Sequence, residues 1–392
     1  MLNTIFGTIP TLRRHRISVS IFFFVAGFTF ASWASRIPDI QAKLSLSEGQ
    51  LGAVLFALPI GLMTSLMVSG GLVTRYGSQI MARIASLGYS ALLPLLGIAN
   101  TTWQLVAVLF FFGIAGNMYN ISCNTQAISL EKMYGRSIMA SFHGIWSTAG
   151  FSGAAVGTLM VNFNLLPWQH FLLISMLGLA ATTLFYPHIV PSDNSTAKRQ
   201  RFALPNGKLL QLGLIAFGCL VCEGTMFEWS GVYFKKVVQV PAAFTTVGYA
   251  AFMGCMATGR FVADGVVTRF GPKRVLQLAG LVIFSGLMLA VLVPHLVVAT
   301  LAFMMVGFGV SSVVPVVYSQ AGKSTTLSPS QALAAVSTVG FAGFLVGPPL
   351  VGFLAQITNL RWSFGAVACI GLMTTVLAST LTSKKATYTP KH

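Results

Sequence analysis

Four ionisable side chains lie inside long apolar runs of the sequence, where charge is rare. They are Glu223 and Glu228 in the run 209–232, and Arg260 and Asp264 in the run 244–266. A charge inside an apolar helix is costly, so it is expected to face a partner or a water-filled cavity. At 1.5 Å per residue, Glu223 falls about 4 Å from the middle of its run, and Glu228 falls about 11 Å toward the C-terminal end.

Two roles are open for Glu223. A carboxyl group at mid-depth can load and release a proton, or it can contact a solute. Alternatively, Glu223 forms a permanent ion pair with Arg260 on the neighbouring helix. We expect Glu228 and Arg260 to contact a solute. Asp264 shares a helix face with Arg260, since the two are four residues apart, and we assign it to a gate.

Three asparagines form a stripe on one predicted helix. Asn117, Asn120 and Asn124 are spaced by three and four residues, which places them on one face. Each amide both donates and accepts hydrogen bonds, which suits a hydroxylated or amide-bearing solute. The alternative is that these amides join neighbouring helices.

Histidine and tryptophan supply the remaining candidates. His143 is a possible proton carrier, or it makes a hydrogen bond between helices. Trp146 lies one turn further along and would offer a stacking surface for a sugar-like solute. Trp229 either contacts a solute near the end of its helix or anchors that helix at the membrane interface.

Other chemistry is not indicated. Cys219-x-x-Cys222 has no His or second cysteine pair near it in the sequence, so the two thiols are interpreted as small buried side chains. The sequence has no G-x-x-x-x-G-K-[ST] loop for ATP, and no Ser/His/Asp set can be assembled from the buried polar residues. We therefore expect no enzyme activity, no cofactor and no metal ion.

The composition indicates what kind of helices carry these candidate residues. Of 392 residues, 55% are hydrophobic and only 8% are charged, and the mean hydropathy is +0.79. A soluble domain has roughly 25% charged residues, so the composition predicts an all-α membrane protein. Twelve apolar runs approximate the length of a membrane-spanning helix: 17–35, 50–70, 80–98, 103–127, 137–160, 168–187, 209–232, 244–266, 275–293, 296–318, 331–353 and 361–382.

The net charge of +17 is interpreted as a topology signal and not as a nucleic-acid surface. With twelve helices both termini lie on the same side of the membrane, and most Lys and Arg residues lie on that side too. The positive-inside rule assigns this side to the cytoplasm. Five basic residues fall on the other side: Arg36, Lys43, Lys235, Lys236 and Arg361.

The two halves of the chain repeat each other. Residues 71–77 (GLVTRYG) return at 265–271 (GVVTRFG), 194 residues later, and Trp168 and Trp362 keep the same offset. Trp33 and Trp229 differ by 196 residues, as do Gly52 and Gly248. Such duplication predicts two six-helix bundles around a central path. The bundles are expected at 1–190 and 209–392, with a cytoplasmic linker at 191–208. Glycines at 150, 153, 157, 340, 343 and 347 should allow close helix packing.

The repeated loops resemble the loop-2/3 motif of the major facilitator superfamily, G-x-L-x-D-R-x-G-R-R. The first copy runs from Gly70 through Arg75 and Gly77 and departs at Thr74, where the family has Asp; the second keeps Arg269, Gly271, Lys273 and Arg274. Three further stretches resemble the bacterial fucose-permease-like branch: Glu131 with Arg136, the segment 141–147 (SFHGIWS), and Glu223-Gly224 with Glu228-Trp229-Ser230.

This resemblance implies a transporter with two pseudo-symmetric six-helix bundles in the inner membrane of a bacterium. It implies that Arg75, Gly77, Glu131, Arg136, Arg269 and Gly271 belong to gates, although the basic turns can also serve topology alone. Gly77 and Gly271 should adopt positive φ. We expect a monomer that moves a small polar solute by alternating access with proton coupling, and whose other partners are membrane lipids. The alternatives are an exporter of amphipathic compounds and a non-transporting sensor.

Overall fold

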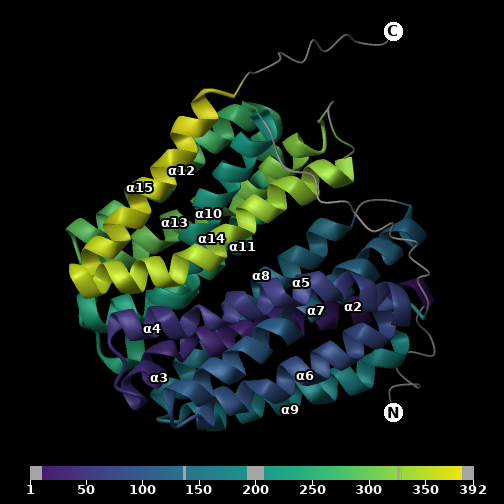
Figure 1. Ribbon diagram of the computed structural model, residues 1–392, viewed down its shortest axis with the longest axis horizontal. Coiled ribbons are helices and arrows are strands. Elements are labelled where there is room, and N and C mark those ends of the chain that lie inside the picture. The colour runs from purple at the N-terminus through teal and green to yellow at the C-terminus, as the bar shows by residue number, and fades with distance from the viewer. Residues whose placement is uncertain (1–10, 136–137, 192–206, 325–326, 328, 382–392) are drawn as a thin grey trace.

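The computed structural model describes residues 11–135, 138–191, 207–324, 327 and 329–381, without the side chains of residues 140, 264, 329 and 330. Throughout this part of the chain the secondary structure is helical, and no strand occurs in it. The helices form two groups, one below the other in Figure 1: α2 to α9, coloured purple to teal, and α10 to α15, coloured teal to yellow. We call these groups the N-terminal half and the C-terminal half.

The bounds of the helices follow the apolar runs of the sequence. The N-terminal half contains α2 (Thr11–Ser35), α3 (Ile37–Lys43), α4 (Glu48–Leu55), α5 (Ala57–Tyr76), α6 (Ser78–Ile98), α7 (Thr102–Tyr134), α8 (Met139–Asn162) and α9 (Pro167–Phe185). The C-terminal half contains α10 (Gly207–Tyr233), α11 (Val247–Phe270), α12 (Pro272–Leu292), α13 (Leu296–Ala321), α14 (Pro329–Ile357) and α15 (Leu360–Ser379). Short helical turns follow at Tyr186–His188, Phe234–Val238 and Ala242–Phe244.

Ten helical segments among the described residues are long and apolar enough to cross a membrane, with α4 and α5 counted as one segment. The helices α8 and α11, each of 24 residues, contain more small and polar side chains and complete the six long segments of each half. Every one of the twelve predicted runs therefore coincides with a helix. The all-α membrane fold is confirmed.

The same helix pairs pack against each other in the two halves. In the N-terminal half α2 packs on α8, α5 on α7, and α6 on both α7 and α9. In the C-terminal half α10 packs on α14, α11 on α13, and α12 on both α13 and α15. This correspondence is the structural counterpart of the sequence repeat, and it explains why Trp33 and Trp229 are both fully buried.

Small residues bring the first and fifth long helices of each half together. A Cβ on Gly153 of α8 would lie 3.0 Å from the carbonyl oxygen of Phe28 on α2. The equivalent contact is that of Gly343 on α14, where a Cβ would lie 2.5 Å from the carbonyl oxygen of Phe217 on α10. Packing this close leaves no room for a side chain, so the predicted packing role is confirmed for Gly153 and Gly343.

The two ends of the molecule differ in what they contain. Thr11, Val190, Gly207 and Ser379 lie at one end, which we call the linker end; the opposite end, with the turns after Ser35, Ile98, Asn162, Tyr233, Leu292 and Ile357, is the distal end. At the linker end Gly77 and Gly271 join consecutive helices with φ of 82° and 78°, so their predicted positive φ is confirmed. The expected linker at 191–208 falls almost entirely outside the described residues, so the bundle boundaries stay a prediction.

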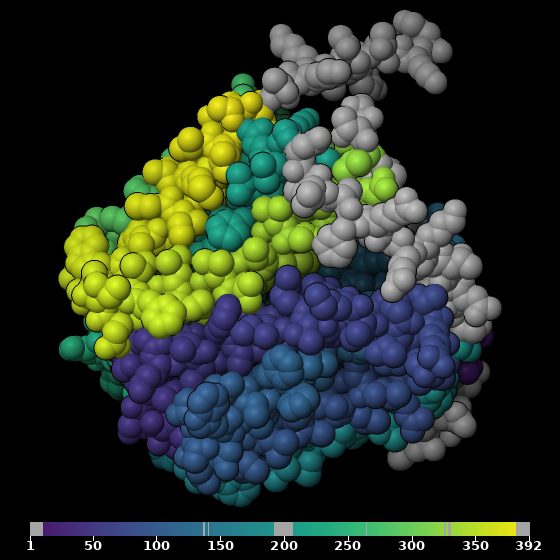
Figure 2. Space-filling view, in the orientation of Figure 1, coloured from purple at the N-terminus to yellow at the C-terminus, as the bar shows by residue number. Residues whose placement is uncertain are grey.

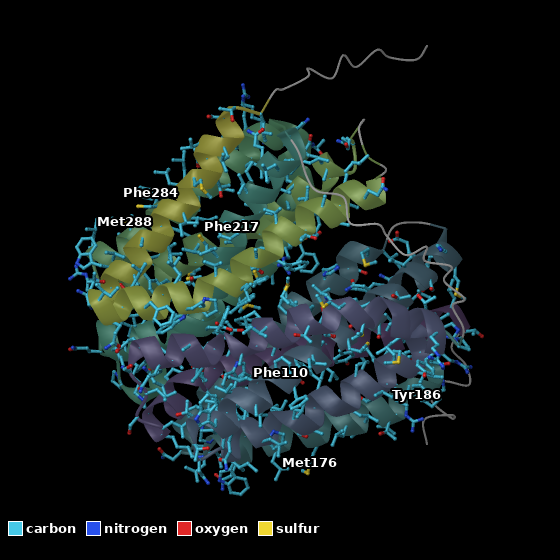
Figure 3. All side chains as sticks on the ribbon, viewed as in Figure 1. Phe110, Met176, Tyr186, Phe217, Phe284 and Met288 are labelled. Carbon is cyan, nitrogen blue, oxygen red and sulfur yellow. The ribbon has the colours of Figure 1, made fainter. Side chains whose placement is uncertain are left out.

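The outer surface of the bundles is apolar. Large hydrophobic side chains such as Met67, Trp103 and Ile357 are at least 80% exposed. Met176 on α9 points outward from the helices in Figure 3 and is exposed as well. An apolar exterior of this extent is suited to lipid tails and not to water.

Candidate functional site

A cavity of about 360 Å³ lies between the two halves. Its size is at the lower end of the range for small-molecule sites, roughly 300–1,000 Å³. Both halves line it, with side chains from α2, α5, α6, α7 and α8 on one side and α10, α11, α13 and α14 on the other. Seven of the predicted solute-binding or proton-handling residues are among the lining residues: Asn117, Asn120, His143, Trp146, Glu223, Glu228 and Arg260.

Arg260 connects three helices at the cavity wall. Its guanidinium group donates a hydrogen bond of 2.7 Å to Oγ of Ser147 on α8 and forms a longer ion pair of 3.4 Å with Glu223 on α10. Glu223 is buried, whereas Arg260 keeps 22% of its side chain exposed. The ion pair considered for Glu223 is therefore present, and it is linked through Arg260 to the N-terminal half.

Glu228 lies in a different environment on the same helix. Its side chain lines the cavity and is 6% exposed, and its Oε2 atom is buried without a hydrogen-bond partner. No basic side chain of the described residues forms an ion pair with it. Glu228 thus places a carboxyl group with an unpartnered oxygen in the cavity wall.

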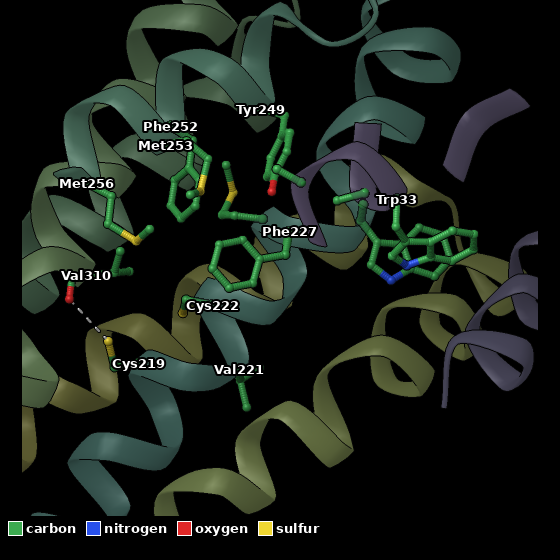
Figure 4. Packing of buried hydrophobic residues seen from close by; sticks show 14 of the residues in the cluster. Trp33, Cys219, Val221, Cys222, Phe227, Tyr249, Phe252, Met253, Met256 and Val310 are labelled. Atoms are coloured by element: carbon green, nitrogen blue, oxygen red, sulfur yellow. Dashed lines mark hydrogen bonds between the residues drawn. The ribbon is translucent and has the colours of Figure 1, made fainter. Parts of the chain in front are cut away.

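Aromatic rings surround Phe227, the residue before Glu228. Its ring lies 5.4 Å from that of Phe30, 6.3 Å from that of Trp146 and 6.2 Å from that of Phe344, measured between centroids. All four side chains line the cavity. On its other side Phe227 packs edge-to-face on Tyr249 and Phe252 of α11 (Figure 4), so the aromatic wall is anchored in the core.

The polar residues of the N-terminal half lie on the opposite wall. Asn117 is buried and its amide donates to Oγ of Ser69 at 3.5 Å, whereas Asn120 is exposed. The ring of His143 is exposed and contacts Phe23 edge-to-face at 5.8 Å. Among the described residues His143 makes no hydrogen bond to a neighbouring helix, so the structural alternative considered for it is not observed.

Two of the predicted solute-binding residues lie away from the cavity. Asn124 does not line it; instead its amide donates to the backbone and side-chain oxygens of Asn120, both at 2.8 Å. Trp229 is fully buried and is packed into the hydrophobic core. Its burial contradicts both interpretations given for it, because a core ring neither contacts a solute in the cavity nor anchors the helix at a lipid interface.

The cysteine pair belongs to the core. The Cys219 thiol donates to the carbonyl of Val310 (Figure 4) and the Cys222 thiol to that of Val367. Both thiols are fully buried. Among the described residues there is no group of three or more His, Cys, Asp or Glu side chains that could hold a metal ion.

At the distal end the two halves are in direct contact. A Cβ on Gly52 of α4 would lie 2.9 Å from Cα of Gly352 on α14, so the two backbones touch. Glu48 forms an ion pair of 2.6 Å with Lys236, and Oε1 of Gln356 accepts from the amide of Gly49. In Figure 2 the purple and yellow-green segments meet on this side without a gap. This end of the cavity is therefore closed.

A second contact closes the distal end between α8 and the start of α11. There Thr158 of α8 and Thr246 are joined by a hydrogen bond between their hydroxyl groups. Beside it, in the N-terminal half, the buried Arg36 pairs with Asp39 at 3.1 Å and donates to the carbonyl of Leu165. Burial lowers the pKa of Arg36, and the Asp39 carboxylate partly opposes this effect.

The predicted gate residues at the linker end are exposed. Arg75 and Arg269 each lie over the ring of the next residue, Tyr76 or Phe270. Nothing lies within 4 Å of a Cβ built on Gly77 or Gly271. The two copied loops are thus not clamped together here.

The other gate candidates are only partly described. Glu131 accepts from the amides of Ile138 and Met139 and so holds the start of α8. Arg136 and the side chain of Asp264 lie outside the described residues. Their assignment to gates, like that of Arg75 and Arg269, stays a prediction.

Several site residues could not be selected from the sequence. Phe30, Phe227 and Phe344 were three of 30 phenylalanines, and Ser147 lay in a segment noted only for a family resemblance. The repeat draws attention to Gly52, because it matches Gly248. No feature of the sequence draws attention to its partner Gly352.

Two helical bundles that meet at the distal end and along α8 and α11, an apolar exterior and a central cavity with buried charges define a multi-pass membrane protein of the carrier type. Residues 18–329 match the model of the Major Facilitator Superfamily, and the chain belongs to this family. It is 31% identical over 364 residues to an uncharacterized MFS-type transporter of Yersinia pestis, covering 93% of this chain and 94% of the relative. It is 28% identical to the membrane protein MosC of Rhizobium meliloti, covering 91% and 87%.

Solved structures support the same fold. The nucleoside transporter NupG superimposes with a TM-score of 0.73 at 15% identity, covering 93% of this chain and 97% of the other. A bacterial homolog of the human lysosomal transporter Spinster gives 0.72 at 14% identity, covering 95% and 97%. These structures show the same fold, and the family model and the relatives show the superfamily. The finer resemblance to the fucose-permease-like branch stays a prediction.

Proposed function

We propose that this protein is a secondary active transporter that moves a small polar solute across the bacterial inner membrane by alternating access, coupled to protons. The observation that carries the proposal is the cavity between the halves, with the Glu223–Arg260 pair and Asn117, Asn120 and His143 in its wall. Family membership and the transporter names of its relatives support a carrier and not an enzyme.

Alternating access is supported by how the halves touch. Contacts such as Gly52–Gly352 and Glu48–Lys236 close the distal end, while the copied loops at the linker end are exposed. A rocking motion of one half against the other around the cavity would break the first set and bring the second together. The excess of Lys and Arg at the linker end favours a cytoplasmic position for that end, so the state described here would be open inward.

Proton coupling is assigned to Glu223. When its carboxyl is ionised it holds Arg260, which in turn donates to Ser147 of the other half. A proton on Glu223 would remove its charge and weaken its pairing with Arg260, and Arg260 would be free to move. His143 lies on the facing helix at the same cavity and is a second proton-handling candidate.

Uptake into proteoliposomes tests the proposal. The purified protein is reconstituted and screened with labelled sugars, amino acids and organic cations, with and without an imposed pH gradient. We expect accumulation of at least one solute against its gradient only when the pH gradient is present. Solute binding without movement across the membrane would instead support a sensor.

The wall formed by Phe30, Trp146, Phe227 and Phe344 supports a second candidate, an exporter of amphipathic compounds. In everted vesicles such an exporter would move lipophilic dyes with broad selectivity. A carrier for one polar solute would leave those dyes outside.

A further inference from the structure

Glu228 stands apart from the other acidic residues of the protein. The structure describes five acidic side chains, and four of them have partners. Asp39 pairs with Arg36, Glu48 with Lys236 and Glu223 with Arg260, and Glu131 accepts from two backbone amides. Glu228 alone among these five has no hydrogen bond or ion pair, although its side chain is only 6% exposed.

A buried carboxylate without a partner is unfavourable, because desolvation is not offset by any attraction. The group avoids this cost by taking up a proton or by pairing with a cation that comes from outside the protein. Since Glu228 lines the cavity, a bound solute is in position to supply that cation.

The surroundings of Glu228 favour an organic cation. Its neighbour Phe227 belongs to the wall of aromatic rings that includes Phe30, Trp146 and Phe344. Aromatic faces attract ammonium groups through their electric quadrupole, and this attraction grows when the site is desolvated. A metal ion is not favoured, because the described residues contain no group of three or more His, Cys, Asp or Glu side chains that could hold one.

The charge balance of the cavity sets the number of charges on the solute. Glu223 and Arg260 form an ion pair and cancel each other. Glu228 is then the one unbalanced ionised group among the Asp, Glu, Lys and Arg residues that line the cavity. One positive charge on the solute would make the loaded cavity neutral.

We propose that the solute of this transporter is a small organic cation, a protonated amine or a quaternary ammonium compound, whose charged group pairs with Glu228 against the aromatic wall. This inference rests on the transporter function proposed above and names the substrate class of that site. The two carboxyl groups then have separate tasks. Glu228 recognises the solute, and Glu223 handles the proton.

Matched probes that differ in charge test this inference on the purified full-length protein in detergent. One trio shares a hexose ring: glucosamine, glucose and glucuronate. The other shares a phenyl ring: 2-phenylethylamine, 2-phenylethanol and 3-phenylpropanoate. Binding is measured as the rise in Tm at a pH where both amines are charged. We expect the amine of at least one trio to stabilise the protein more than its neutral and anionic partners.

The variant Glu228→Gln separates a counter-ion from a proton site. If Glu228 is protonated when the amine binds, Glu228→Gln should bind the amine as tightly as the wild type, because glutamine imitates a protonated carboxyl. Loss of a buried counter-ion should instead weaken Kd by about a hundredfold, while leaving the neutral probe unchanged. The inference is overturned if no amine stabilises the protein more than its neutral partner, or if Glu228→Gln binds the amine as tightly as the wild-type protein.

A comparison without ligand provides an independent readout. Glu228→Gln removes an unpaired buried acid, so the Tm of the empty protein should stay the same or rise. The matched variant Glu223→Gln leaves the charge of Arg260 without its carboxylate partner, so its Tm should fall. A fall for Glu228→Gln as large as that for Glu223→Gln would assign Glu228 a structural role and overturn the inference.

Failure of the inference can be told apart from failure of the proposed function. An amine that binds in detergent through Glu228 but is not taken up by proteoliposomes would support the cation site and contradict transport. Uptake of a neutral or anionic solute would support transport and contradict the cation site.

Discussion

Arg260 of the C-terminal half donates a hydrogen bond of 2.7 Å to Ser147 of the N-terminal half. The same guanidinium group forms the ion pair with Glu223 at the cavity wall. The charge state of one carboxyl is therefore connected, through a single side chain, to a contact that holds the two halves in their present arrangement.

Removing the hydroxyl of Ser147 should loosen this arrangement. Ser147→Ala eliminates the acceptor for Arg260 without changing any charge, and one hydrogen bond to a charged group is worth about 1.5–3 kcal/mol. We expect the population to shift away from the state described here by about tenfold or more. Spin-label distances across the linker end measure the shift. Ser152→Ala is the control, because Ser152 on the same helix donates only to its own backbone at Thr148, and its distances should match the wild type.

Glu223→Gln should uncouple solute movement from protons. The glutamine cannot ionise, so the release and recapture of Arg260 would no longer follow the pH gradient. Concentrative uptake into proteoliposomes should be lost, while exchange of labelled for unlabelled solute stays measurable. Glu48→Gln is the comparison variant, because it removes a partly exposed acid outside the cavity. It changes the distal contact with Lys236 and can alter the rate of uptake, but uptake should still depend on the pH gradient. Concentrative uptake by Glu223→Gln at the wild-type level would refute coupling through this residue.

A side chain at Gly52 should prevent closure of the distal end. A Cβ there would lie 2.9 Å from Cα of Gly352 and 3.0 Å from the carbonyl oxygen of Pro348, so the backbones must separate. We expect Gly52→Ala to favour states open at the distal end, and cysteines introduced beside it to react faster with impermeant reagents. Gly70→Ala is the control. Nothing lies within 4 Å of its added Cβ, and alanine raises helix propensity. Equal labelling rates in the two variants would show that this contact does not close the protein.

Arg269→Ala should affect the outward-open state, in which the linker end is closed. Arg269 is exposed and contacts only the neighbouring Phe270 ring in the described structure, so its loss should leave the Tm of this state almost unchanged. If the copied loops form the closed gate at the linker end, the variant should depopulate the outward-open state. Distances between spin labels on α5 and α14 at the linker end measure this change. Arg83→Ala, which removes a cation stacked on Tyr186 within the N-terminal half, is the control. Distances in Arg269→Ala identical to those of the wild type would remove Arg269 from the gate.

The helices could be predicted because each one depends only on the residues of its own apolar run. An apolar run of membrane length must satisfy its own backbone hydrogen bonds, and a helix does so without any partner. The runs at 17–35 and 209–232 therefore correspond directly to α2 and α10. Polar residues in such runs are costly wherever they lie, which is why Glu223, Arg260 and Asn117 could be selected for the cavity before any contact was known.

The orientation of a side chain around its helix was less predictable. Trp229 follows Glu228 in the sequence, yet Glu228 lines the cavity while Trp229 is in the core. A helix that packs on neighbours along most of its surface has little amphipathic pattern to distinguish these faces. The repeat offered the missing clue, because Trp33 and Trp229 occupy equivalent core positions on α2 and α10.

Contacts between the halves were not predictable at all. The meeting of Gly52 with Gly352, or of Arg260 with Ser147, depends on how two separately folded bundles are oriented. Neither contact leaves a pattern within one helix. Such pairs emerge only from the assembled structure.

Two contacts between the halves close the distal end, Thr158–Thr246 and Gly52–Gly352. They differ in chemistry, although the duplication placed them at related positions. Thr158 precedes Gly352 by the same 194 residues that separate the copied loops, but the first contact joins hydroxyl groups and the second joins bare backbone. Water can replace a hydroxyl partner as the threonines separate, whereas separating Gly52 from Gly352 also breaks the nearby Glu48–Lys236 ion pair. Opening of the distal end should therefore be asymmetric. The Thr158–Thr246 contact should separate first and the Gly52–Gly352 contact afterwards.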